Sequence, residues 1–274
     1  MTTAFVLGGG GVLGAVEVGM LRALFEADVA PDLVLGTSVG ALNGALVARD
    51  PSPTVIDHLT ELWRGVSESG RDVVGDKALR TVRRAVASGT HLYSAKPMRQ
   101  RLDEELGDVR FEDLAVRLQV CAASIERSAE HWFDSGRVVD AVVASAAVPG
   151  LLPPAKVGDE HYLDGGIVNS IPLGRAVQLG ADRVFVLQVG RIDRPLKPPR
   201  RPWDVARVSF EIARRHRFVR ELAELPDSVE CHVLPARGTS ERDDTIRAHR
   251  DFGSVQRRID ETYDASVAYL QKHL

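Results

Sequence analysis

A serine between two glycines, at the junction of a short apolar run and a segment of small residues, constrains this chain more than any other feature. The stretch GTSVG (36–40) follows the apolar residues 33–36 and precedes a predicted helix at 39–49. A sharp strand-to-helix turn holds such a serine clear of its own backbone, and the turn needs flanking positions without Cβ atoms. Ser38 is therefore predicted to end a buried strand as a candidate nucleophile. The alternative is a serine that serves only as a turn and helix N-cap.

Short apolar runs alternate with longer amphipathic ones along the chain, which is typical of a sheet covered by helices. Continuous runs such as VFVL (184–187) indicate strands buried on both faces, so we expect an α/β protein with a mainly parallel sheet. The predicted strands are 3–8, 33–36, 118–124, 130–136, 183–189 and 230–235. The predicted helices are 14–27, 39–49, 54–67, 75–87, 96–106, 137–147, 172–180, 203–224 and 246–272.

Composition narrows the class of protein further. With 274 residues, 44% of them hydrophobic, the chain is expected to form one domain, and a net charge of −3 argues against nucleic acid as a partner. The apolar run at the start ends after four residues and indicates a buried strand rather than a signal peptide. No run approaches the roughly eighteen apolar residues of a membrane span. Cys121 and Cys231 lack the spacing of a metal site, which predicts a reducing, cytoplasmic location and no bound metal.

A run of four glycines, Gly8 to Gly11, follows the first predicted strand, so several backbone N–H groups can face one point. Two interpretations compete. The stretch GGGVLG (9–14) satisfies G-x-G-x-x-G, and Asp28 and Asp32 follow near the spacing of a dinucleotide site. The same loop could instead form the oxyanion hole of an acyl-transfer serine. If the first two strands are parallel neighbours, their carboxyl ends bring the loop next to Ser38, which favours the oxyanion hole.

A serine nucleophile also needs a base, and Asp164 has the most distinctive setting among the candidates. The stretch HYLDGGIVNSIPL (161–173) places it after a short apolar strand, before two glycines, with Pro172 at a predicted helix start. None of the eight histidines has a comparable setting. An Asp-Gly pair by itself is typical of a turn, so it is the combination with the two earlier motifs that makes Asp164 a candidate base.

The three motifs together resemble the patatin-like phospholipases, in which a glycine-rich loop, a G-x-S-x-G turn and a later Asp-Gly-Gly occur in this order. The resemblance covers about residues 3–190 and extends to VVASAAVPGLLPP (142–154), which is similar to the family's small-residue helix ending in Pro-Gly. It implies a three-layer α/β/α domain over residues 1–274, with about 200–274 as a C-terminal helical extension. The matching residues are Gly9, Gly10, Gly11, Val12 and Gly14 in the first motif, Gly36, Ser38 and Gly40 in the second, and Asp164, Gly165 and Gly166 in the third.

The resemblance implies a lipid acyl hydrolase that works with a serine and an aspartate and without histidine, cofactor or metal. Ser38 would attack an ester carbonyl, Asp164 would accept its proton, and the N–H groups of Gly9 to Val12 would hold the oxyanion. The expected substrates are phospholipids, lysophospholipids or neutral lipids. One position departs from the family, because Leu13 stands where Lys or Arg is usual. A contribution of that cation to holding an anionic head group is therefore not expected here.

Two other functions stay open from the sequence. A Ser-His-Asp esterase would use His232 or His249 after Asp164 in chain order, and a nucleotide-binding or scaffold module would keep the glycine loop without catalysis.

The segment 194–220 is basic and amphipathic, and it predicts either a helix that covers the sheet with a solvated basic face or a peripheral contact with anionic membrane. Trp203, at its start, suits an interface anchor. The apolar positions at helical spacing are Val205, Val208, Ile212, Val219 and Leu222, and the basic ones are Arg194, Lys197, Arg200, Arg201, Arg207, Arg214, Arg215, Arg217 and Arg220.

Overall fold

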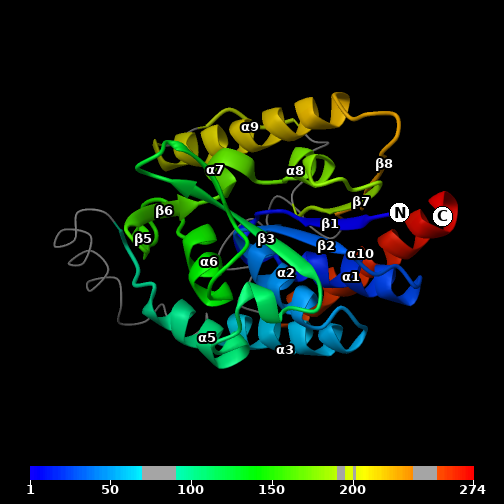
Figure 1. Cartoon of the computed structure of the whole chain (residues 1–274), viewed down its shortest axis with the longest axis horizontal. Coiled ribbons are helices and arrows are strands. Elements are labelled where there is room, and N and C mark those ends of the chain that lie inside the picture. Colours follow the sequence, from blue (N-terminus) through cyan, green and yellow to red (C-terminus); the bar gives the residue numbers. More distant parts are fainter. Residues whose placement is uncertain (70–90, 190–194, 200–201, 237–251) are drawn as a thin grey trace.

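The computed structural model describes residues 1–69, 91–189, 195–199, 202–236 and 252–274. A central sheet runs through the described residues with helices on both faces (Figure 1). In space the strands follow the order β5-β6-β3-β2-β1-β7-β8, and β4 pairs with β3 off this path. Their bounds are β1 Thr3–Leu7, β2 Leu33–Thr37, β3 Arg117–Ser124, β4 Ala129–Phe133, β5 Ala155–Val157, β6 Glu160–Asp164, β7 Arg183–Leu187 and β8 Glu230–Val233.

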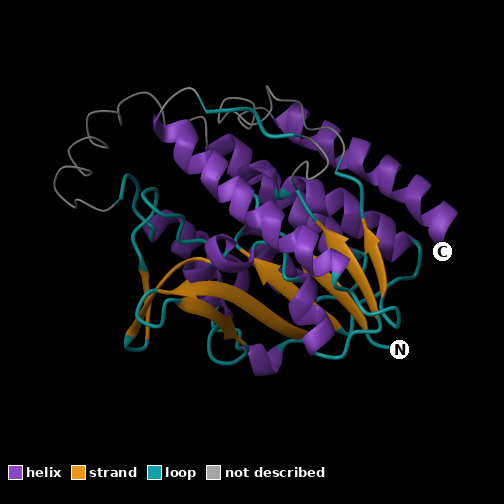
Figure 2. Ribbon diagram, turned by 90° about the horizontal axis from the view of Figure 1, so that it is seen from above, coloured by secondary structure: helices purple, strands orange, loops and turns teal. Residues whose placement is uncertain are grey.

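The helices form two layers, one above and one below the sheet in Figure 1, and Figure 2 shows the same fold from above. One layer packs on the larger apolar cluster and consists of α1 Ala15–Glu26, α2 Val39–Arg49, α3 Thr54–Ser69, α5 Lys96–Leu106, α6 Val138–Ser145 and α10 Phe252–His273. The opposite layer consists of α7 Gly166–Asn169, α8 Leu173–Gln178 and α9 Pro202–Ala223. Short 3₁₀ turns lie at Gly11–Leu13 and Phe111–Asp113. The predicted three-layer α/β/α fold is confirmed.

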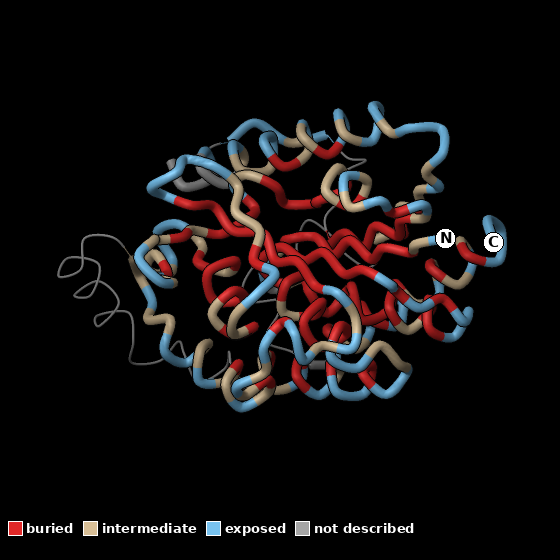
Figure 3. Tube along the Cα trace, in the orientation of Figure 1, coloured by how far each residue is buried: buried red, intermediate tan, exposed pale blue. Residues whose placement is uncertain are grey.

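The strands at the centre of the sheet are buried on both faces, as their continuous apolar runs predict. In β1, Phe5 and Leu7 point into one cluster, whereas Ala4 and Val6 point into the other. Figure 3 shows these central strands as a buried layer between partly exposed helices. The strands β1, β2, β3, β7 and β8 are parallel to their neighbours in this group, and the antiparallel pairs all involve β4, β5 or β6.

The sequence locates most of the elements but misses the shortest ones. The helices at 39–49 and 96–106 have the predicted bounds, while β5 and α7, of three and four residues, were not predicted. The strand predicted at 130–136 is shorter in the structure, where β4 ends at Phe133. The predicted helix at 75–87 lies outside the described residues.

The C-terminal region is more than a helical extension of the sheet. β8 adds a parallel strand next to β7, and α10 packs closely on α1. A Cβ atom at Gly19 of α1 would overlap the carbonyl oxygen of Ile259 in α10, so the two helix backbones approach each other at this glycine. Residues beyond 200 therefore contribute both to the sheet and to its main apolar cluster.

Candidate active site

The predicted strand-to-helix turn is present and is strained at its serine. Ser38 lies between β2 and α2 with φ 55° and ψ −119°, a left-handed conformation that costs a non-glycine residue of order 1–3 kcal/mol. A Cβ atom at Gly40 would overlap the carbonyl oxygen of Leu7, so α2 approaches the end of β1 directly. This close approach places the turn beside the glycine loop that follows β1.

Asp164 is the last residue of β6 and faces Ser38. The Ser38 hydroxyl donates a hydrogen bond of 2.6 Å to Asp164 Oδ2, and the Gly166 N–H donates one of 2.7 Å to Oδ1. Ser38 is only 6% exposed and Asp164 only 2% exposed. Burial raises the pKa of Asp164 to about 6, although both hydrogen bonds favour the charged form. The carboxylate is thus held in one orientation, with a proton affinity well above that of an ordinary aspartate.

The register of the sheet explains how residues 126 positions apart meet. Thr37, the last residue of β2, pairs with Cys121 of β3, and Asp164, the last residue of β6, pairs with the next residue, Ala122. Since β4 occupies the other edge of β3, β2 and β6 share one edge and meet end to end there. Both candidate residues therefore reach the same level of β3. A Cβ atom at Gly165 would overlap the carbonyl oxygen of Cys121, which explains why a glycine follows the aspartate.

Ser145, at the end of α6, connects the two halves of the site. Its hydroxyl accepts the Ser38 N–H at 2.7 Å and donates to the Cys121 carbonyl at 2.6 Å. Its own carbonyl accepts the Gly165 N–H at 3.2 Å. Sequence reasoning did not single out Ser145, although it is the one hydroxyl residue in the apolar stretch VVASAAV (142–148).

The glycine loop differs from expectation at one position. The Gly9 N–H donates to the Ser170 carbonyl at 2.9 Å, so it is not a spare donor. The Gly11–Leu13 turn is closed by hydrogen bonds of 3.3 Å from Leu13 to Gly10 and from Gly14 to Gly11. Within the described part of the chain, no backbone hydrogen bond is given by the N–H groups of Gly10 and Gly11. These N–H groups can therefore face a ligand.

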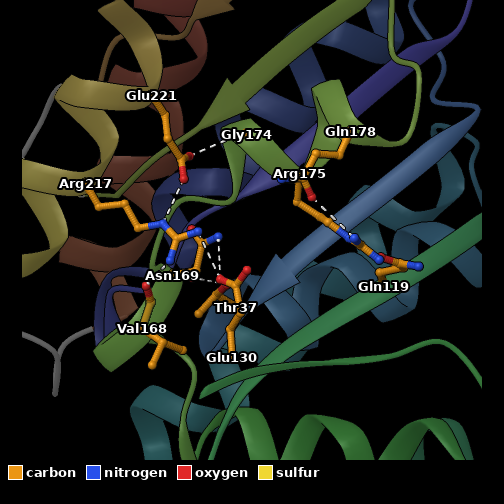
Figure 4. Close-up of polar contacts among 10 residues, drawn as sticks. All are labelled: Thr37, Gln119, Glu130, Val168, Asn169, Gly174, Arg175, Gln178, Arg217 and Glu221. Atoms are coloured by element: carbon orange, nitrogen blue, oxygen red, sulfur yellow. Dashed lines mark hydrogen bonds and ion pairs between the residues drawn. The ribbon is translucent and has the colours of Figure 1, made fainter. Parts of the chain in front are cut away.

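Residues after Asp164 support the loop and the turn from the other side. Thr37 Oγ1 donates to the Asn169 carbonyl at 2.9 Å, as Figure 4 shows, and Asn169 Nδ2 donates to Glu130 at 3.3 Å. The Ser170 hydroxyl is buried without a partner and lies 3.1 Å from where a Cβ atom of Gly9 would stand. These contacts tie the α7 segment to both predicted motifs. No sequence signal beyond proximity to Asp164 pointed to them.

The histidine and dinucleotide interpretations find no support in the geometry. His232 lies in β8, stacks on Phe185 with ring centroids 4.8 Å apart, and contacts Glu230 at 3.0 Å. β7 and β1 separate β8 from β2, so His232 is not beside Ser38. His249 lies outside the described residues. Asp32 accepts the Thr3 N–H at 2.8 Å, which places it at the amino end of β1, the edge opposite the glycine loop.

The described residues offer neither a metal site nor a membrane span. No group of three His, Cys, Asp or Glu side chains gathers there as a possible metal site. No helix there combines the length and the apolar character needed to cross a bilayer.

Leu13, at the position where a cation is usual, packs against the main apolar cluster.

The basic segment forms α9, whose cations are largely engaged within the protein. Arg214 is buried and contacts Glu211, and Arg217 contacts both Glu130 at 3.0 Å and Glu221 at 2.7 Å. The helix covers the sheet, as one of the two predictions had it, but the predicted solvated basic face is wrong for these two residues. Arg194, Arg200 and Arg201 lie outside the described residues.

Known proteins with similar sequences carry the same domain. A family profile described as patatin-like phospholipase matches residues 5–177. Lysophospholipase nte1 of Aspergillus terreus is 32% identical over 192 residues, which is 70% of this chain and 12% of that protein. Neuropathy target esterase sws of Drosophila melanogaster is 31% identical over 190 residues, 69% of this chain and 13% of that protein. The chain thus spans about an eighth of the length of these curated relatives.

Among solved structures, VipD from Legionella pneumophila has the same fold. The TM-score is 0.51 at 14% identity, and the match covers 99% of this chain and 67% of VipD. The likeness to VipD shows the class of fold, an α/β/α protein with a mainly parallel sheet. The chain belongs to the patatin-like phospholipase family.

Proposed function

We propose that the protein hydrolyses acyl esters of lipids with Ser38 as nucleophile and Asp164 as general base. The observation that carries this proposal is the 2.6 Å hydrogen bond from the Ser38 hydroxyl to a buried carboxylate. Ser38 Oγ adds to the ester carbonyl carbon while its proton passes to Asp164. As the tetrahedral intermediate collapses, the ester bond breaks and the leaving alcohol takes that proton. A water molecule then adds to the acyl-enzyme, again giving its proton to Asp164, and the fatty acid leaves as the proton returns to Ser38.

The environment of Asp164 supports its role as a base. An ordinary aspartate is a poor proton acceptor at neutral pH, because its pKa lies far below the working pH. Burial raises the pKa of Asp164 to about 6, which makes the carboxylate more basic while leaving it charged at pH 7. No histidine is required for the proton transfer.

The oxyanion is assigned to the N–H groups of Gly10, Gly11 and Val12. Their loop follows β1, and the close contact of Gly40 with Leu7 keeps this loop beside Ser38. Gly9, which was expected to be a fourth donor, is left out because its N–H is bonded to Ser170. Backbone donors that are already oriented cost no rearrangement when negative charge develops on the substrate oxygen.

Among the expected lipids, lysophospholipids are the proposed substrate class. The names of the curated relatives describe lysophospholipases. The family profile matches residues 5–177, which contain Ser38 and Asp164. A lysophospholipid has one acyl chain, so one reaction cycle releases one fatty acid and a water-soluble head group.

A fluorophosphonate probe and a lipid hydrolysis assay test the proposal together. The parent protein should be labelled on Ser38 and should release fatty acid from lysophosphatidylcholine, measured by mass spectrometry. Ser38→Ala should abolish both signals, and Asp164→Asn should reduce hydrolysis almost as much, whereas the control His232→Gln should retain activity. Labelling that persists in Ser38→Ala, or loss of activity in His232→Gln, would refute the assignment.

A further inference from the structure

Four apolar side chains of α9 point outward, whereas Arg214, Arg217 and Glu221 of the same helix point inward. Val205, Ile212 and Val219 are 50%, 55% and 54% exposed, and Leu222 is 38% exposed. Their spacing of seven, seven and three residues puts them on one side of the helix. An amphipathic helix on a globular protein ordinarily buries this side. We call these four residues the outer stripe.

The inner side of α9 is held by polar contacts, several of which Figure 4 shows. Arg217 donates to the Val168 carbonyl at 2.7 Å and pairs with Glu130 and Glu221. Glu221 in turn accepts the Gly174 N–H at 2.8 Å. Among the described side chains of α9, Phe218 is the one large apolar side chain that lies fully within the second apolar cluster. The helix is therefore anchored by its charges, which leaves the outer stripe available.

Arg220 provides an exposed positive charge beside the outer stripe of α9. The two glutamates of the helix, Glu211 and Glu221, are partly buried and paired with arginines of the same helix. His216 and Arg220 are exposed beside the outer stripe. Apolar side chains flanked by basic ones are the signature of a helix that lies in the interface of an anionic membrane.

A second copy of the same helix fits this face less well than lipid does. Positions 205, 212 and 219 with 208, 215 and 222 follow a heptad pattern, but the position between Val208 and Leu222 is Arg215. Arg215 contacts Glu211 at 3.4 Å, and a helix pair would bury this charged contact in its seam. At a membrane surface a long arginine can instead extend toward the phosphates while its stem stays among apolar groups.

The position of α9 connects this face to the candidate site. Phe210 of α9 packs on Gly166, two residues after Asp164, and Arg217 holds the carbonyl of Val168 in α7. Figure 1 shows α9 beside α7, and the two helices are in contact. Ile167, in α7, is another exposed apolar side chain.

We infer that the outer stripe of α9, with His216 and Arg220, is the surface by which the protein docks on an anionic lipid bilayer. This inference rests on the proposed function for its meaning, since docking brings a lipid hydrolase to its substrate. The sequence predicted a membrane contact through basic residues of 194–220, whereas the surface inferred here is an apolar stripe with basic residues beside it.

Co-sedimentation with vesicles of phosphatidylcholine and phosphatidylglycerol in equal parts tests the inference on the full chain. The parent should bind, and Val205→Ser with Ile212→Ser and Val219→Ser should weaken binding by at least about tenfold, because apolar area drives interfacial insertion. A matched control replaces exposed apolar residues elsewhere, Ile125→Ser with Leu274→Ser, and should bind as the parent does. Thermal unfolding of each variant verifies that it is folded.

Three results would overturn the docking surface: a parent that stays in the supernatant, a triple variant that binds as well as the parent, or a control that loses binding equally. Light scattering tests the alternative that a second copy of the chain binds this face. A parent dimer that the triple variant converts to a monomer would overturn the membrane-docking surface. Failure of the proposed function is seen separately, as a parent that binds vesicles but does not hydrolyse a soluble short-chain ester.

Discussion

Replacing Asp164 by asparagine should make the protein more stable at pH 8 while it removes activity. A folded-state pKa of about 6 in place of the ordinary 3.8 means that the folded protein holds the charged carboxylate at a cost. That cost is absent below the unfolded-state pKa, grows as the pH rises, and is complete above the folded-state pKa. The difference corresponds to about 3 kcal/mol at pH 8. An amide of the same shape does not carry it.

The sign and size of the effect follow from which state loses its proton first. Between pH 3.8 and 6 the unfolded chain ionises while the folded chain keeps its proton, so the parent loses stability as the pH rises through this window. At pH 5 the advantage of Asp164→Asn should therefore be roughly half of its value at pH 8. In thermal terms, the gain at pH 8 is at most roughly 6–12 °C in Tm for a domain of this size.

Urea unfolding followed by circular dichroism at pH 5 and pH 8 measures this difference. Asp159→Asn, in the exposed turn between β5 and β6, is the control and should show no gain at either pH. Two results would refute the reasoning: an Asp164→Asn variant that is less stable than the parent at pH 8, or a gain that is the same at both pH values. Either would mean that the buried carboxylate is not the strained group that its surroundings indicate.

Three further predictions concern the reaction. For a soluble ester, kcat/KM should fall to half near pH 6 and continue to fall in acid, because Asp164 must be deprotonated to accept the Ser38 proton; a pH–rate profile measures this. Ser145→Ala should lower kcat by about 10- to 100-fold with KM unchanged, since Ser145 positions Ser38 and the Asp164 loop without a role in binding, and steady-state kinetics separates the two constants. Leu13→Arg should leave hydrolysis of neutral short-chain esters within roughly tenfold of the parent, because the oxyanion donors are backbone groups; rates on anionic lipids measured alongside should rise if a cation there holds head groups.

The sequence alone predicted the class of fold, and the three motifs taken together predicted Ser38 and Asp164 as candidate partners, which the structure places in hydrogen-bond contact. Each of these predictions starts from local signals. The apolar runs of β1, β2 and β7 mark strands buried on both faces. Glycines such as Gly40 and Gly165 mark places where another backbone approaches too closely for a Cβ atom. Such constraints act within a few residues, so they remain readable without the three-dimensional structure.

Other features depended on the tertiary structure, because they join residues far apart in the chain. Ser145 contacts Ser38 from 107 positions away, and Gly9 gives its N–H to Ser170 rather than to a ligand. Neither partner is recognisable from its own neighbourhood in the sequence.

The orientation of α9 shows the same limit most clearly. Its periodicity predicts an apolar side and a basic side but does not say which side meets the sheet. The tertiary structure determines this orientation. Glu130 of β4 and Val168 of α7 provide polar partners for Arg217, and Gly174 of α8 provides one for Glu221. A helical pattern determines which residues share a face, whereas the groups that the fold places opposite that face determine whether it is buried.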